Sequence, residues 1–167
     1  SLGKIITEMD ETQAVCDKID ADLVLAKAEI VLAKAEAAEL ATQTDNSGDI
    51  ATALTAINTA ADKFRADGSD PALFGDESTY HTSNSAMTNV KTYVDRAITY
   101  INGNFPDAAY DLVANLADVD AELTSEDIEL ASGRMQQVQT TLNAVDADLK
   151  IAQTYITEWN TMVQTLS

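Results

Sequence analysis

The sequence has little of the chemistry on which most catalytic and metal centres depend. Its 167 residues include one cysteine, one histidine and two prolines. Because Cys16 has no second cysteine to pair with, an intrachain disulfide and a cysteine-based zinc site are both excluded. The sequence also has no phosphate-binding glycine loop, no Gly-x-Ser-x-Gly elbow and no His-Glu-x-x-His motif. We therefore predict no catalytic residue, no cofactor and no metal centre, and we expect a protein that is not an enzyme.

Basic residues are also scarce. The chain has 10 Lys and Arg residues against 28 Asp and Glu residues, so its formal net charge is -18. A surface of this sign repels the phosphates of nucleic acids and the headgroups of anionic lipids. No stretch approaches the roughly 18 consecutive apolar residues of a membrane-spanning helix. We expect neither a nucleic acid nor a membrane as a partner.

Aromatic residues make up only 5% of the chain, although 46% of it is hydrophobic. The chain is therefore too hydrophobic to be disordered, and its apolar residues are mostly small. Small apolar residues spread over long periodic segments favour helices that pack closely, rather than a core built on aromatic rings.

Apolar residues recur at alternating spacings of three and four over two long stretches, the pattern of a helix with one buried face. The first stretch has a single polar member and the second has none. They predict two long helices, at about 2–43 and 125–166. The first stretch consists of Leu2, Ile5, Met9, Thr12, Cys16, Ile19, Leu23, Ala26, Ile30, Ala33, Ala37 and Leu40. The second consists of Ile128, Ala131, Met135, Val138, Leu142, Val145, Leu149, Ala152, Ile156, Trp159, Val163 and Leu166.

In the middle of the sequence the apolar periodicity is interrupted more often, which predicts shorter helices. Glycine, proline and small polar residues follow one another closely over 67–84, so we predict a mobile loop there. The apolar stripes around this loop predict three short helices, at about 49–66, 85–102 and 106–122. Together with the two long helices they predict an all-α fold, a single elongated helical bundle over residues 1–167.

Local signals predict where several of these helices begin and end. Asn102 and Gly103 are typical of a helix C-terminus, and Pro106 suits the first turn of the helix that follows. Thr124 or Ser125, followed by two acidic residues, is the predicted N-terminal cap of the last long helix.

A short repeat in the first long helix places apolar residues on a second face. Leu25–Glu29 and Leu32–Glu36 both read Leu-Ala-Lys-Ala-Glu. The lysines of the repeat fall at e positions of the heptad and the glutamates at g positions. In a parallel coiled coil, a g residue pairs with the e residue of the following heptad on the neighbouring helix, here Glu29 with Lys34. The apolar residues outside the main stripe are Val24, Leu25, Val31 and Leu32. We therefore expect this stretch to contact more than one neighbouring helix, in a bundle interior or between chains.

Three residues belong to types that are common in catalytic or binding sites, but we assign none of them to such a site. His81 lies in the predicted loop without a second histidine to complete a site, so we interpret it as a solvated side chain. Cys16 falls on the apolar stripe of the first long helix, where a small apolar residue belongs. Trp159 falls on the stripe of the last helix, where an indole more often fills a core than a ligand site.

Acidic clusters are the remaining candidates for ion binding. The clusters at 17–22, 118–122 and 146–148 lack the twelve-residue spacing with a central glycine that an EF-hand requires. We interpret them as solvated helix faces, with weak binding of divalent cations as the alternative. The clusters at 67–70 and 75–78 are better placed, because a loop can wrap around an ion.

The last long helix carries unusually little charge. Residues 128–167 include four acids and two bases, namely Glu129, Asp146, Asp148, Glu158, Arg134 and Lys150. A solvent-facing helix usually carries more charge, whereas an uncharged polar surface suits packing against copies of itself. We therefore predict a homo-oligomer with this helix at or near the interface. The candidate interface residues are Arg134, Gln137, Thr141, Tyr155, Trp159 and Met162.

The same region carries a resemblance to a known group of proteins. Residues 123–166, including Arg134-Met-Gln-Gln-Val-Gln-Thr-Thr-Leu142, resemble helical segments of virion structural proteins of marine tailed bacteriophages. The resemblance implies a non-enzymatic building block of a capsid, tail or fibre, located in the virion. Its implied partners are further copies of this chain and other virion proteins.

A second function remains open from the same residues. The chain is alternatively a helical sensor or ligand-binding bundle, located outside the cell or in the periplasm. In that case the loop at 67–84 and the neighbouring helices would form a small-molecule pocket.

Overall fold

Helices make up nearly all of the part of the chain that the computed structural model describes, which is residues 2–65, 73–74, 85–103 and 110–166. No strand occurs among these residues. The helices are α1 (Leu2–Leu40), α2 (Ser47–Asp62), α3 (Ser85–Asn102), α4 (Leu112–Thr124) and α5 (Ile128–Leu166). The predicted all-α fold is confirmed. The two long helices, α1 and α5, have 39 residues each and are therefore roughly 58 Å long.

The turn between α4 and α5 differs from the prediction. The hydroxyls of Thr124 and Ser125 donate to carbonyls one turn back in α4, so both residues end that helix. Glu126 then adopts a positive φ of 62°, which breaks the helical path. Asp127 is the actual cap of α5, because its carboxylate accepts a hydrogen bond of 3.0 Å from the backbone N–H of Leu130.

The short helices also begin and end at somewhat different residues than predicted. α2 starts at Ser47, because the Asn46 side chain accepts a hydrogen bond from the N–H of Asp49. α4 starts at Leu112, because Asp111 has an extended backbone and caps the helix instead of continuing it. Pro106, the predicted start of this helix, lies outside the described residues. α3 matches its predicted range.

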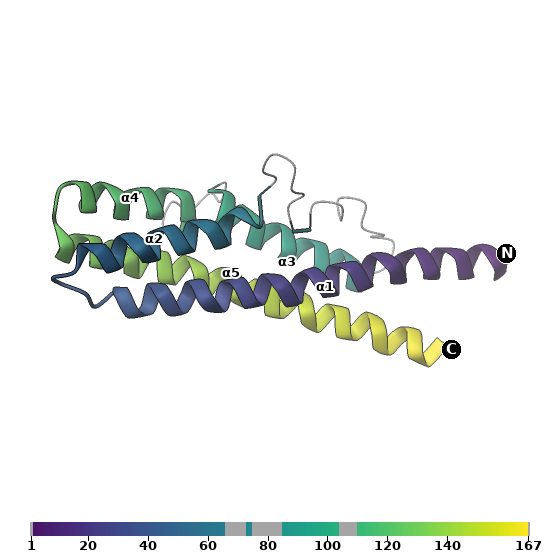
Figure 1. Ribbon diagram of the computed structural model, residues 1–167. Coiled ribbons are helices and arrows are strands. Elements are labelled where there is room, and N and C mark those ends of the chain that lie inside the picture. The colour runs from purple at the N-terminus through teal and green to yellow at the C-terminus, as the bar shows by residue number, and fades with distance from the viewer. Residues whose placement is uncertain (1, 66–72, 75–84, 104–109, 167) are drawn as a thin grey trace.

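The bundle is organised around α5, which contacts α1, α3 and α4 along its length. Figure 1 shows that α2 and α4 lie over one half of the two long helices and α3 over the other half. The half with α2 and α4 is a four-helix bundle together with α1 and α5. The start of α1 and the end of α5 lie at the other end of the molecule, away from the four-helix half, and the two helices diverge there (Figure 1).

The core follows the two predicted apolar stripes. All core members of α5 from Ala131 to Ile156 are at most 1% exposed, and those of α1 from Cys16 to Leu40 are at most 3% exposed. Side chains from α2, α3 and α4 complete one continuous cluster, which includes Ile50, Ile57, Phe64, Met87, Val90, Ile101, Leu112 and Val119. Small residues such as Ala26, Ala33, Ala131 and Ala152 lie among the large ones on both long helices and allow them to pack closely.

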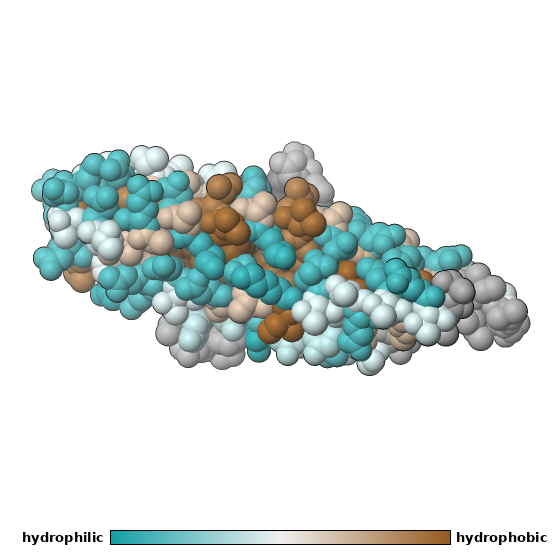
Figure 2. Space-filling view, turned by 90° about the horizontal axis from the view of Figure 1, so that it is seen from below, coloured by the Kyte–Doolittle hydropathy of each residue, from teal (hydrophilic) through white to brown (hydrophobic). Residues whose placement is uncertain are grey.

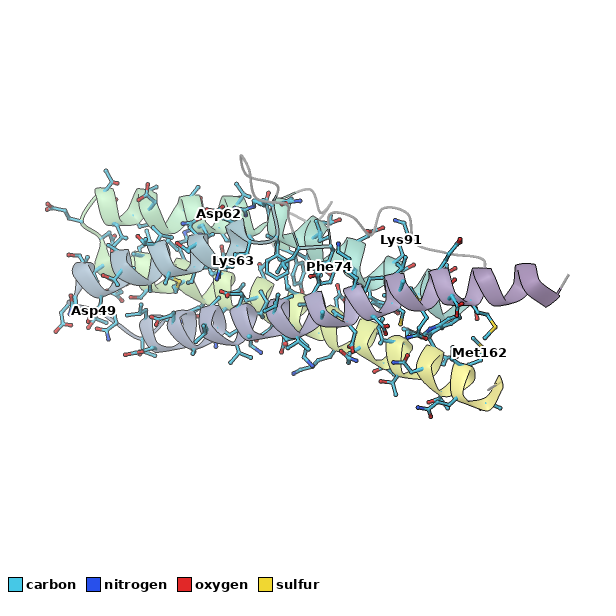
Figure 3. The ribbon with its side chains drawn as sticks, turned by 45° about the vertical axis from the view of Figure 1, so that its right-hand side comes forward. Asp49, Asp62, Lys63, Phe74, Lys91 and Met162 are labelled. Carbon is cyan, nitrogen blue, oxygen red and sulfur yellow. The ribbon has the colours of Figure 1, made fainter. Side chains whose placement is uncertain are left out.

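Two residues of the predicted mobile loop pack against this core. Phe74 is buried, and its ring lies 6.4 Å from the ring of Phe64 between centroids. Its N–H points to the Asp22 carboxylate of α1 at 3.4 Å, and Figure 3 shows Phe74 against the bundle beside α1. The N–H of Leu73 donates to the carbonyl of Lys63 at 2.9 Å. The rest of the loop, including His81 and the acidic clusters at 67–70 and 75–78, lies outside the described residues.

A matched pair of leucines on α5 tests whether the bundle is organised around this helix. Leu149 is fully buried and Leu130 is 42% exposed. We expect Leu149→Ala to lower the free energy of unfolding by about 2–5 kcal/mol, since it removes buried methyl groups and leaves a cavity. The same change at Leu130 should cost less than about 1 kcal/mol. Urea unfolding followed by circular dichroism measures both, and equal losses would contradict the arrangement.

Candidate functional site

An ion pair with two hydrogen bonds joins α5 to α3. Asp148 is 2% exposed, and its two carboxylate oxygens accept hydrogen bonds of 2.9 and 2.7 Å from Nε and Nη2 of Arg96. This two-pronged geometry raises the pKa of Arg96, mainly through the hydrogen bond to Asp148. Arg96 also lies 5.2 Å from the ring centroid of Tyr93, which stacks on Tyr155 of α5. The arrangement joins α3 to α5 through one edge of the guanidinium, while the Arg96 side chain itself stays 46% exposed.

A second buried carboxylate joins α5 to α1. Asp146 is 4% exposed and accepts hydrogen bonds from the Nζ atoms of Lys34 at 3.0 Å and Lys150 at 2.9 Å. Burial raises the pKa of Asp146, but the hydrogen bonds and positive charges of Lys150 and Lys34 outweigh it, so the pKa lies below its ordinary value. The acidic pair at 146 and 148 is therefore buried and paired, and its interpretation as a solvated helix face was wrong.

Two further polar contacts complete the attachment of α5 to its neighbours. Asn115 of α4 is buried and donates to Oγ1 of Thr141 at 2.8 Å. The indole N–H of Trp159 donates to Oε1 of Gln13 on α1 at 2.8 Å, and Gln13 donates in turn to Asn160. α1, α3 and α4 thus each have at least one polar contact with α5 at a fixed position along its axis. Together these contacts set the register of the bundle.

These contacts show where the six candidate interface residues lie. Thr141 and Trp159 are buried inside their own chain, and Arg134 and Tyr155 are half-buried. Only Gln137 and Met162 are exposed, and they lie far apart along α5. The low charge of α5 has a cause within one chain, since three other helices cover it. An oligomer interface on α5 stays a prediction, and it is restricted to its exposed residues.

A large apolar surface is instead found on α1. We call it the outer face of α1 and define it by its exposed residues Ala21, Val24, Leu25, Ala28, Val31, Leu32, Ala35 and Ala38. Its four large side chains are 56–63% exposed. In Figure 2, which views the molecule from below, hydrophobic side chains gather near the middle of this side. Within one chain this stretch already contacts two helices, α2 and α5, as predicted. Among the described residues, however, none covers the outer face itself.

Charged residues line the two sides of the outer face with opposite sign. Lys34 points to α5, where it binds Asp146, and Lys27 lies one heptad earlier on the same side. Glu29 points to the opposite side, where it accepts a hydrogen bond of 2.5 Å from Lys63 at the end of α2. Figure 3 shows Lys63 on the side of α2 that faces α1. Glu36 lies one heptad after Glu29, so a basic edge and an acidic edge border the face.

A groove between α2 and α4 is the main concave feature described on these two helices. It has a volume of about 450 Å³ and is lined by Leu54, Thr55, Asn58, Arg65, Val113, Leu116, Ala117 and Asp120. Its one basic residue, Arg65, is already engaged, because it binds the Asp62 carboxylate at 3.0 Å and the Ile101 carbonyl at 2.5 Å. The groove therefore presents no unengaged positive charge to a ligand.

The described residues contain no group of three His, Cys, Asp or Glu side chains that could hold a metal ion. Cys16 lies in the core as predicted, and burial, together with Asp17 and Asp20, raises the pKa of its thiol to about 12. A thiol of this kind stays protonated at neutral pH and is a poor nucleophile.

No protein-family model, curated protein or solved structure matches this chain. Among the described residues, no helix combines the length and the apolar character that a membrane crossing requires.

The ion pair between α3 and α5 gives a testable energy. We expect Arg96→Ala to lower the free energy of unfolding by about 2–3 kcal/mol, because it leaves the buried Asp148 carboxylate without its partner. Lys91→Ala on the same helix is the control, since its ion pair with Asp95 is solvent-exposed and should be worth less than about 1 kcal/mol. Urea unfolding of both variants measures the difference, and equal effects would rule out a special role for Asp148.

The lowered pKa of Asp146 predicts a dependence on pH. A carboxylate with a lower pKa in the folded state stabilises the fold above its unfolded pKa, and this contribution is lost as the pH falls through the folded value. We expect the stability difference between the wild type and Asp146→Asn to be largest near neutral pH and to shrink as the pH falls below 3.8. Asp118→Asn, at an exposed position on α4, is the matched control. Thermal unfolding between pH 2 and 7 measures both, and a difference that persists at low pH would contradict the assignment.

Proposed function

We propose that the protein is a structural, self-associating helical bundle whose copies pack through the outer face of α1. The observation that carries the proposal is the exposure of Val24, Leu25, Val31 and Leu32 on one helix face. Apolar side chains that are contiguous on a surface and bordered by charged residues are typical of protein–protein contacts.

The charge of the molecule supports the same location for the contact. The chain has a net charge of -18, so two copies repel each other over most of their surfaces. Between Ala21 and Ala38, however, two lysines offset two of the three acidic residues. Repulsion is therefore weak where the exposed apolar side chains are found.

We further propose that the assembly is part of a bacteriophage virion, as a building block of a capsid, tail or fibre. This part of the proposal is supported by the resemblance of residues 123–166 to virion structural proteins. A contact surface on a bundle without an assigned reactive group is consistent with a building block that is present in many copies.

A helical sensor or ligand-binding bundle is the second candidate. The groove between α2 and α4 is the observation that favours it. It ranks below self-association, because Arg65 in this groove is already bound within the chain, whereas none of the described residues covers the outer face of α1.

The mass of the protein in solution tests self-association. We expect light scattering to show a stable oligomer, and we expect Leu32→Glu to weaken its association by about 100-fold, because a charge replaces apolar area buried in the contact. Val113→Glu, which introduces the same charge at an exposed residue of α4, is the matched control and should leave the oligomer intact.

Two results would overturn the proposal. The first is a wild-type protein that stays monomeric at high concentration. The second is an oligomer that Leu32→Glu leaves unchanged but that Gln137→Glu disrupts, since this would place the contact on α5. Circular dichroism of each variant establishes that the fold is retained.

A further inference from the structure

We infer that two copies of this chain pair through α1 in a parallel, in-register arrangement, with the outer face of each α1 against the other. This inference rests on the proposed self-association and adds the orientation and alignment of the partner. Three observations carry it: the extent of the apolar stretch, its small central residues and the sign of the charges on its two edges.

The apolar stretch fixes how far the two helices overlap. It runs from Ala21 to Ala38, between the acidic residues Asp17 and Glu39, whose positions continue the same face. A displacement of one helix along the other would bring apolar side chains onto these acidic ends. The largest apolar contact is therefore made when the two stretches overlap completely, in either a parallel or an antiparallel orientation.

Small residues at the centre of the face allow the two helices to approach closely. Ala21, Ala28 and Ala35 repeat every seven residues and are all exposed. The large side chains lie on both sides of this row. With alanine at the centre, two helix axes can approach to roughly 8 Å, the short end of the usual range. At that separation the charged edges of one helix come within reach of the edges of the other.

In the parallel orientation, the basic edge of each helix meets the acidic edge of its partner. Lys27 then lies beside Glu29 of the second copy, and Lys34 lies beside Glu36 of the second copy. Because the pair is symmetric, each of these contacts occurs twice. The same geometry places Asp20 beside Asp22 of the second copy, so one like-charge contact stands against two opposite-charge contacts. Lys34 and Glu29 remain in contact with Asp146 and Lys63 of their own chain, so they join those ion pairs into a network across the contact.

In the antiparallel orientation with the same overlap, like charges meet. Lys27 then lies beside Lys34 of the second copy, and Glu29 lies beside Glu29 of the second copy. Glu36 lies beside Asp22 of the second copy. Like charges placed opposite each other disfavour an interface, so charge selects the parallel pair.

Parallel pairing gives the assembly a direction. In each copy the end with the α1–α2 and α4–α5 turns is opposite to the end where α1 and α5 diverge (Figure 1). Two parallel copies therefore present two α1–α2 turns at one end and two diverging helix pairs at the other.

Disulfide cross-linking of single-cysteine substitutions tests the orientation. Ala21→Cys and Ala35→Cys place a thiol near each end of the central alanine row. In the parallel pair, residue 21 lies opposite residue 21 and residue 35 opposite residue 35, so each variant alone should form cross-linked dimers under mild oxidation. The wild type, whose Cys16 is buried, is the control and should form none.

The outcomes separate the orientation from the proposed function. Cross-links that form only when the two variants are mixed would establish the antiparallel pair and overturn this inference, while self-association would stand. An oligomer by light scattering without either cross-link would place the contact elsewhere and also overturn it. A wild-type protein that is monomeric throughout would overturn the proposed function itself.

Discussion

Coverage of α5 by other helices is the constraint on which the rest of the structure depends. This helix has a core face that is fully buried and polar residues on other faces that are buried as well, so one neighbour cannot cover it. α1, α3 and α4 each cover one part of it. Each also meets it through a polar contact, from Lys34 to Asp146, from Arg96 to Asp148 and from Asn115 to Thr141. Because a buried carboxylate without its partner is costly, these contacts admit one register for each helix.

The same constraint explains why an apolar face remains on α1. The core face of α1 is used against α5, α2 and the segment at Phe74. None of the described residues covers the opposite side of α1, where Val24 and Leu32 are 63% exposed. A helix with two apolar faces in a bundle that covers one of them is suited to join two bundles. The charge of the chain acts in the same direction, since a net charge of -18 disfavours contact over most of the surface and the lysines beside this face reduce that repulsion.

The periodicity of the sequence predicted the helices and most of the core. Every residue of the stripes from Cys16 to Leu40 and from Ala131 to Trp159 is buried, because residues spaced by three and four lie on one face of a helix. Helix ends were less predictable. Thr124, Ser125 and Asp127 are all suitable caps, and the choice of Asp127 depends on the positive φ at Glu126.

The candidate site was predictable only in part, because composition does not reveal which chain covers a residue. The low charge of α5 is compatible with burial by its own chain and with burial by a second chain, and Thr141 and Trp159 belong to the first case. The ion pairs of Asp146 and Asp148 join residues far apart in the sequence, so no local pattern predicts them. The exposed face did leave a signal, namely the apolar pairs outside the main stripe of α1.

The central claim is that the outer face of α1 is covered when copies of the chain assemble. Carbene footprinting at two protein concentrations tests it most directly, because this label reports the solvent exposure of individual side chains. The account predicts that labelling of Val24, Leu25, Val31 and Leu32 falls as the concentration rises, whereas labelling of Val113 and Leu130 stays constant. Unchanged labelling of the outer face in a sample that light scattering shows to be assembled would contradict it.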